Sequence, residues 1–264
     1  MLIVGGARSP PLPITSHTRG KTKPLPFVQG SFTVGPATPS GFYYSWAMRN
    51  AFHEELDSIG VSLLQMAGLV KEAMIDATNA LLNADLSLAE KVIAADDTID
   101  QIQHDLDART INLMARQQPV ASDLRVLVSS LRISADLERM GDLAHHIAKQ
   151  ARMRYPSTAV PEELLPTIRN MGTVSNAIID KLSVVMEHQD SVRALEIEKD
   201  DDEMDKLHRQ LIATLLDDNW KHGIESAIDM TLLGRYYERC ADHAVSIARR
   251  VYFQVTGEYA APVL

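Results

Sequence analysis

The chain has 264 residues, of which 45% are apolar and only 5% aromatic, and its net charge is -9. The excess of helix formers such as Leu, Ala and Met over aromatic residues predicts an all-α protein. The acidic balance, without a stripe of Lys and Arg, argues against a nucleic-acid partner. The single cysteine, Cys240, excludes an internal disulfide and indicates a reducing compartment.

The first 47 residues are rich in Pro, Gly, Ser and Thr and lack a helical period. Such a composition buries too little apolar surface to offset the ordering entropy, so residues 1–47 are predicted to be a disordered leader. Met48 opens the first periodic stretch and is an alternative candidate for the start of translation. From there to about Asn83, apolar residues recur at helical spacing: Leu56, Ile59, Leu63, Met66 and Val70.

Two more helices are expected in the first half. Ser87 and Glu90 form a capping-box pattern that would start the second helix, and Pro119 would stop it. Ser122 can then cap a third helix that continues to about Arg154. No apolar run approaches the roughly 18 residues that a membrane span requires, so no spanning segment is expected.

The stretch "RYPSTAVPEELLP" contains three prolines and is the only good interior linker. It divides the ordered chain into residues 48–155 and 156–264. The second part should also contain three helices, over residues 162–187, 191–217 and 223–256.

The two halves repeat one another. "DDTIDQI" from Asp96 matches "DDEMDKL" from Asp201, and "LERMGDLAHHIA" from Leu137 matches "YERCADHAVSIA" from Tyr237. Because both blocks occur in the same order, the simplest interpretation is two tandem copies of a three-helix bundle.

Each matched block contains two acidic residues four positions apart, which share one face of a helix. Acidic pairs at this spacing arise often by chance in so acidic a chain, but these four occupy equivalent places in the repeat. The pairs are Asp96 with Asp100, Glu138 with Asp142, Asp201 with Asp205, and Glu238 with Asp242.

The position of these acids around each helix predicts their surroundings. At about 100° per residue, the acids of the third and sixth helices fall within apolar stripes and should point into the bundle. The acids of the second and fifth helices lie at the stripe edges. The two stripes are Leu124, Leu127, Val128, Leu131 and Ala135, and Ile224, Ala227, Ile228, Thr231 and Val245.

Adjacent carboxylates on a face of low dielectric must be protonated, paired with Arg or Lys, or bound to a cation. Oxygen-rich clusters on facing helices suit Fe, Mn, Mg or Zn, and metal binding is the favoured interpretation. The competing interpretation is an ion-pair network with Arg139, Arg235 and Arg239. Histidines beside the acids could add nitrogen ligands: His145, His146, His208 and His243.

Motifs for covalent catalysis are missing from the sequence. It has no Gly-rich phosphate loop and no G-x-S-x-G turn, and Cys240 has no base partner in sequence. The chain is therefore predicted not to be an enzyme.

Several motifs together resemble the PhoU family of phosphate-specific transport system accessory proteins, over about residues 48–257. They are the doubled "ERMGDLA" and "ERCADHA", the preceding "DDTID" and "DDEMD", the turn "QQPVASDLR" and the closing "RVYFQVTGE". The stretch "MRNAFHEELD" is most similar to actinobacterial members.

This resemblance implies two three-helix bundles related by pseudo-twofold symmetry, a cytoplasmic location, and frequent homodimers. It also implies a negative regulator of phosphate uptake and starvation signalling, acting as an adaptor between the ATPase subunit of the phosphate ABC transporter and a sensor histidine kinase. Such a protein would reach the membrane through its partners only. In the family, the E(D)-x-x-x-D motifs hold multinuclear metal clusters, which assigns as ligands Asp96, Asp100, Glu138, Asp142, Asp201, Asp205, Glu238 and Asp242.

Two other classes of protein compete with this interpretation. A ferritin-like di-metal oxidoreductase needs E-x-x-H on two helices, whereas the chain offers D-x-x-H at Asp142 with His145 and at Asp205 with His208. A histidine-phosphotransfer bundle needs an exposed histidine, and His145 at the centre of its stripe fits poorly.

Overall fold

The computed structural model describes residues 40–260, and their side chains from residue 50 onward. This part of the chain is helical and contains no strand, which confirms the all-α prediction. Its elements are α1 (Ser40–Asn83), α2 (Leu86–Gln117), α3 (Ala121–Arg154), the 3-10 helix η1 (Glu162–Leu164), α4 (Leu165–His188), α5 (Ser191–Leu215) and α6 (Gly223–Thr256).

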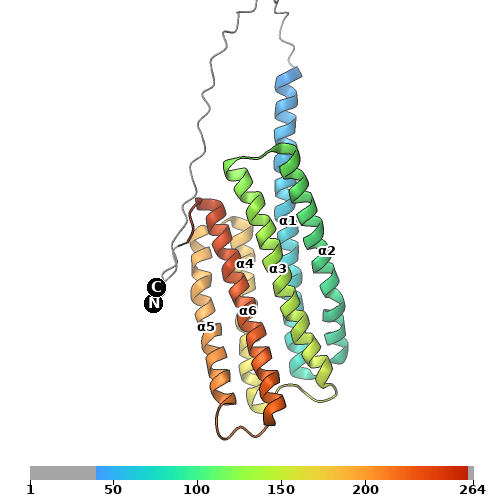
Figure 1. The fold of residues 1–264 in the computed structure, drawn as a ribbon, viewed down its shortest axis with the longest axis vertical. Helices are drawn as coiled ribbons and strands as arrows, with labels where there is room; N and C mark the ends of the chain where they lie inside the picture. The colour runs from blue at the N-terminus through green and yellow to red at the C-terminus, as the bar shows by residue number, and fades with distance from the viewer. Residues whose placement is uncertain (1–39, 261–264) are drawn as a thin grey trace, which may run out of the picture. The chain divides into compact units, whose positions relative to one another are not determined.

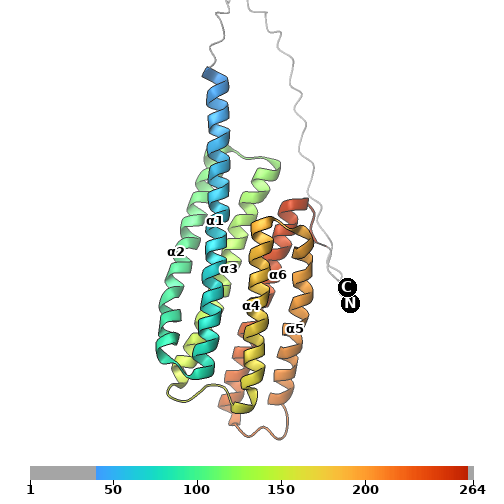
Figure 2. The ribbon, with the colours of Figure 1, turned by 180° about the vertical axis from the view of Figure 1, so that it is seen from behind.

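The helices form two three-helix bundles, α1–α3 and α4–α6, within one compact unit that begins at Tyr43. Figure 1 shows α3 and α6 side by side at the junction of the bundles, and Figure 2 shows α1 beside α4 on the opposite face. The contact between α1 and α4 includes an ion pair, in which Lys71 of α1 lies 2.5 Å from Asp180 of α4. Both bundles therefore share one core.

Contacts between α3 and α6 show how the repeats are related. Ser246 of α6 donates a hydrogen bond to Asp136 of α3 at 3.0 Å. The matching residues of the opposite repeats are His146 and Tyr236, and their rings pack together with centroids 5.4 Å apart. Exchanging the repeats thus maps one contact onto the other, as a pseudo-twofold axis between α3 and α6 requires.

The apolar face of α1 is buried in the core of the first bundle. Five large residues on this face are each at most 5% exposed: Ile59, Leu63, Met66, Val70 and Met74. By length and composition alone, Asn50–Asn83 could also cross a membrane, although the sequence has no uninterrupted apolar run of that length. The reason is that α1 combines many small and apolar residues with few charges, a composition that equally suits a helix buried in a bundle.

The start of α1 differs from the prediction. The helix begins at Ser40, so residues 40–47 are helical although the composition of residues 1–47 predicted a disordered leader. The last prolines of that segment are Pro36 and Pro39, and averaging over the segment hid the proline-free stretch that follows them. Residues 1–39 lie outside the described residues.

The predicted caps of two helices were also wrong. α2 starts one residue before Ser87, and its N-cap is Asp85, whose Oδ1 accepts a hydrogen bond from the Leu88 amide at 3.0 Å. Carboxylate and hydroxyl side chains both cap helices well, and the nearer of the two to the end of α1 takes the position. α3 begins at Ala121 after Val120, and no side chain caps it, so Ser122 has no capping role.

A close approach of α4 to α1 depends on Gly172. A Cβ atom at this position would lie 2.7 Å from Thr78 Cγ2. Thr78 cannot move easily, because its hydroxyl is hydrogen-bonded to the Met74 carbonyl at 2.7 Å and to the Tyr237 hydroxyl at 2.8 Å. The glycine therefore holds the two bundles at close range.

Replacing Gly172 with alanine should destabilise the protein by about 2 kcal/mol, because the added methyl group overpacks the junction. Gly60→Ala is the matched control, since a Cβ at Gly60 meets nothing within 4 Å. That control should be stabilised by up to about 1 kcal/mol through helix propensity. Urea unfolding of both variants measures the two effects, and equal shifts would contradict the proposed close approach.

Candidate metal centres

The first carboxylate cluster lies between α2 and α3. It brings together Asp96 and Asp100 of α2 with Glu138 and Asp142 of α3. Gly141 lies between the two acids of α3, and a Cβ there would touch Asp96 Oδ1 at 3.6 Å. The tighter contact would be with Ile99 Cδ1 at 3.0 Å, so the absence of a side chain at Gly141 lets Ile99 of α2 pack closely against α3.

The carboxylates of this cluster repel one another. Burial raises the pKa of Asp100, and the negative charges of Asp96 and Asp142 raise it further. Burial also raises the pKa of Glu138, with Asp142 as the next largest cause. Asp100 Oδ1 is buried and has no hydrogen-bond partner among the described residues. The negative charge of the first cluster is therefore not fully compensated.

The second cluster is the equivalent set between α5 and α6. Burial, followed by the charges of Asp242, Asp205 and Glu238, raises the pKa of Asp201 to about 7. Burial and the charge of Asp242 raise the pKa of Glu238. Asp201 Oδ1 and Glu238 Oε2 are buried without a partner in the described part of the chain. The eight predicted residues thus gather into two clusters, one in each repeat.

Arginine neutralises each cluster only in part. Arg139 contacts Glu138 at 3.4 Å and Asp142 at 2.8 Å, and Arg235 pairs with Glu238 in the other repeat. The ion-pair interpretation is therefore correct for these two arginines. One guanidinium group beside four carboxylates still leaves an excess of negative charge, and three buried carboxylate oxygens remain unpartnered.

Histidines lie beside both clusters, and His104 next to Asp100 is one of them. His145 hydrogen-bonds to Asp96 through Nδ1, and its Nε2 is buried without a described partner. His208 lies near Glu238 and lowers the pKa of that residue against the larger effect of burial. Two other histidines are engaged elsewhere: His146 packs on Tyr236, and His243 bonds to Asp136 at 3.0 Å.

The predicted orientation of the acids was wrong. The stripes chosen from the sequence are not the core faces of α3 and α6, because Leu124 is 41% exposed, Ile224 80% and Ile228 54%. The core face of α3 instead includes Leu137, about 100° from Glu138, and of the predicted α3 stripe only Leu127 is buried. Glu138, Asp142 and Glu238 instead lie half-buried beside the paired helix, and Asp242 is exposed, so water and ions can reach these acids.

A cation would satisfy the clusters chemically. As the side chains stand, no group of three or more His, Cys, Asp or Glu within residues 50–260 converges closely enough to hold a metal ion. The unpartnered oxygens Asp100 Oδ1, Asp201 Oδ1 and Glu238 Oε2 are nevertheless hard oxygen donors that lack a positive partner. Small side-chain rotations would be needed to complete a coordination shell.

Sequence reasoning missed a third polar site, at Asp136. This carboxylate accepts hydrogen bonds from Ser246, from His243 and from Arg250 Nε, each at 3.0 Å. Burial alone would raise the pKa of Asp136, but the hydrogen bonds from His243 and Arg250 outweigh it and hold the pKa below its ordinary value. No pattern in sequence marks it, because its partners lie more than a hundred residues away.

Comparisons with known proteins agree with this architecture. A family model described as the PhoU domain matches residues 63–151 and 168–251, one match in each repeat. PhoU homolog 2 of Mycobacterium tuberculosis, a phosphate-specific transport system accessory protein, is 46% identical over 212 residues, which cover 80% of this chain and 100% of that protein. This mycobacterial relative agrees with the resemblance to actinobacterial members.

Two crystal structures share the fold. PhoU from Pseudomonas aeruginosa matches with a TM-score of 0.70 and 30% identity, covering 78% of this chain and 100% of that chain. The phosphate transport system regulatory protein PhoU from Streptococcus pneumoniae matches with a TM-score of 0.71 and 29% identity, covering 80% and 99%. With the repeat, the fold and the sequence all in agreement, the chain belongs to the PhoU family.

Proposed function

We propose that the protein is an accessory regulator of phosphate transport. The observation that carries this proposal is the match of both repeats to the PhoU domain, together with relatives that are named as accessory or regulatory proteins of phosphate transport. A regulatory rather than enzymatic role is supported by Cys240. Its thiol is fully buried, and burial raises its pKa to about 12, so it is a poor nucleophile.

The finer proposal is a cytoplasmic adaptor that restrains phosphate uptake and starvation signalling. Its partners would be the ATPase subunit of the phosphate ABC transporter and a sensor histidine kinase, and it would act as a homodimer. Exposed apolar side chains at matching places of both repeats support contacts with other proteins. They are Leu124 and Val128 of α3, and Ile224 and Ile228 of α6.

Metal ions bound by the two carboxylate clusters would supply the missing positive charge. In the first cluster the ligands would be Asp96, Asp100, Glu138 and Asp142, and in the second Asp201, Asp205, Glu238 and Asp242. Fe, Zn, Mn and Mg all suit such oxygen donors. Because each cluster draws on two helices, a bound cation would pin α2 to α3 and α5 to α6 and so fix the shape of the binding surface.

A ferritin-like di-metal oxidoreductase is a weaker proposal. Its D-x-x-H pairs would have to face one another, but His145 lies beside the first cluster and His208 beside the second, in different bundles. Oxygen-dependent oxidation of ferrous iron by the purified protein would favour this alternative.

Deletion of the gene is expected to switch on phosphate-starvation genes in phosphate-rich medium, because a negative regulator is lost. Since related organisms carry a homolog 1 and a homolog 2, any second copy should be deleted as well. A reporter fused to a phosphate-starvation promoter measures the effect, and complementation with the intact gene is the control. Full repression in the strain that lacks every copy would refute the proposed regulation.

A further inference from the structure

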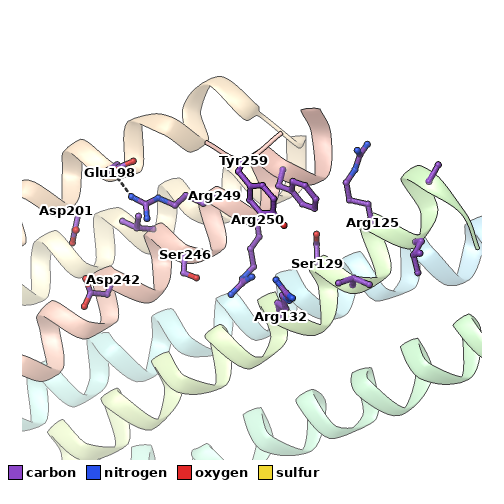
Figure 3. Close-up of a pocket in the computed structure, with 15 residues that line it drawn as sticks. Arg125, Ser129, Arg132, Glu198, Asp201, Asp242, Ser246, Arg249, Arg250 and Tyr259 are labelled. Atoms are coloured by element: carbon purple, nitrogen blue, oxygen red, sulfur yellow. Dashed lines mark hydrogen bonds and ion pairs between the residues drawn. The ribbon is translucent and has the colours of Figure 1, made fainter. Parts of the chain in front are cut away.

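A cavity of about 750 Å³ lies between the N-terminal half of α3 and the C-terminal half of α6. Figure 3 shows that the second carboxylate cluster, with Asp201 and Asp242, borders it at one end, while arginines from both helices line the remainder. Its volume is within the usual range for small-molecule sites, about 300–1,000 Å³.

Four arginines line this cavity, and two of them carry unbalanced charge. Arg249 donates to Glu198 at 2.5 Å, and Arg250 donates to Asp136 through Nε at 3.0 Å. Arg132 has no hydrogen-bond or ion-pair partner among the described residues. Arg125 lies over the Phe253 ring, with its Cζ 5.8 Å from the ring centroid, and its Nε is buried without a hydrogen-bond partner in this part of the chain. An unpaired guanidinium group at a cavity wall is suited to an anion.

The free donors converge from two helices. Arg250 uses only Nε for Asp136, so its two terminal nitrogens remain available. In Figure 3, Arg132 of α3 and Arg250 of α6 extend toward the same part of the cavity. The Ser129 hydroxyl also lines this wall, and none of the described residues bonds to it. Two guanidinium forks and a hydroxyl form a donor set for phosphate oxygens.

Part of the cavity wall is apolar and aromatic. Leu124, Val128 and Val245 line it, and the Phe253 ring stacks on Tyr259 with centroids 4.5 Å apart and planes 14° from parallel. Inorganic phosphate would leave this wall uncovered, since it fills only a small part of the volume. A ligand with a flat apolar group beside its phosphate would cover both surfaces.

We propose that this cavity binds an organic phosphate of nucleotide size. Arg132 and Arg250 would hold its phosphate groups, and its ring system would lie against Val128 and Phe253. The proposal does not depend on the proposed regulatory function, because it concerns binding by the purified chain.

The test is isothermal titration calorimetry of the full chain with ATP, AMP and inorganic phosphate, at fixed ionic strength and with EDTA present. One nucleotide should bind per chain, and inorganic phosphate should bind at least tenfold more weakly because it misses the apolar wall. Arg132→Gln should weaken nucleotide binding at least tenfold. Arg209→Gln is the matched control, because Arg209 is exposed on α5, outside the cavity, and should change nothing.

A second variant tests the apolar wall. Val128 is 37% exposed, so Val128→Asp should fold, and its carboxylate should repel the ligand and abolish binding. Circular dichroism checks that each variant retains its helices. The proposal fails if the wild-type chain binds neither nucleotide saturably, if inorganic phosphate binds as tightly as AMP, or if Arg132→Gln and Val128→Asp leave the affinity unchanged.

Discussion

Replacing Asp201 with asparagine is expected to stabilise the metal-free protein and to weaken its binding of divalent cations. In EDTA at pH 8, the substitution removes a charge that Asp242, Asp205 and Glu238 repel, and it should raise the free energy of unfolding by about 1–2 kcal/mol after allowance for the partial exposure of Asp201. With Mn²⁺ or Zn²⁺, the same change removes a ligand, so bound metal should fall.

The pH dependence of this stabilisation has a definite sign. The carboxyl of Asp201 ionises at about 3.8 when it is unperturbed and at about 7 in the folded protein, so the folded state binds more protons between these values. The wild-type protein therefore loses stability as the pH rises through this window, and the advantage of Asp201→Asn grows from nearly nothing at pH 4 to its full value above pH 7.

Urea unfolding in EDTA at several pH values, and elemental analysis after gentle purification, measure the two effects of Asp201→Asn. Asp202→Asn removes one negative charge from the adjacent exposed position. It should change the free energy of unfolding and the metal content much less than Asp201→Asn does. Glu138→Ala and Glu238→Ala extend the metal analysis to α3 and α6. If all of these variants held as much metal as the wild-type protein, the carboxylate clusters would not be the metal centres.

Replacing Asp136 with alanine should destabilise the protein by about 3 kcal/mol, the largest effect expected of any polar substitution. The change leaves Arg250 half-buried without its carboxylate and removes the acceptor of His243 and Ser246 at the junction of the repeats. Asp97→Ala, at an exposed position on α2, is the control and should change stability by less than about 0.5 kcal/mol.

Acid should narrow this difference. Because the folded-state pKa of Asp136 is below the ordinary value of 3.8, its contribution is complete above pH 3.8 and is lost as the pH falls through the folded value. Thermal unfolding between pH 7 and pH 2 measures the gap between the wild-type and Asp136→Ala proteins. A gap that stayed constant over this range would mean that the ionised carboxylate does not hold the repeats together.

The helices and the internal repeat could be predicted from the sequence because they follow from local patterns. Hydrophobic spacing, the proline-rich linker and the two matched blocks lie within short windows. The grouping of the eight acids followed from the repeat, since equivalent positions on paired helices must meet if each copy folds alike. The spacing of four residues then brought each pair onto one face.

The orientation of the acids could not be predicted, for a physical reason. Leu124 and Ile224 lie in line with the acids and are apolar, so periodicity alone could not distinguish an exposed apolar ridge from a core stripe. The choice between them depends on which neighbouring helix covers each face. The partners of Asp136 were hidden for the same reason, because the register of α3 against α6 is set by packing between the two repeats.

The pseudo-twofold relation of the repeats has a consequence for stoichiometry. At the equivalent place of the opposite repeats, Glu225, Leu232 and Gln150 match Arg125, Arg132 and Arg250, and only Lys149, which matches Arg249, is basic, so this end of the helix pair is less basic. Two identical half-length chains would have to carry two identical ends. Because both copies are fused in one polypeptide, the two ends can differ in sequence. One anion can then bind at a single end and make the molecule asymmetric.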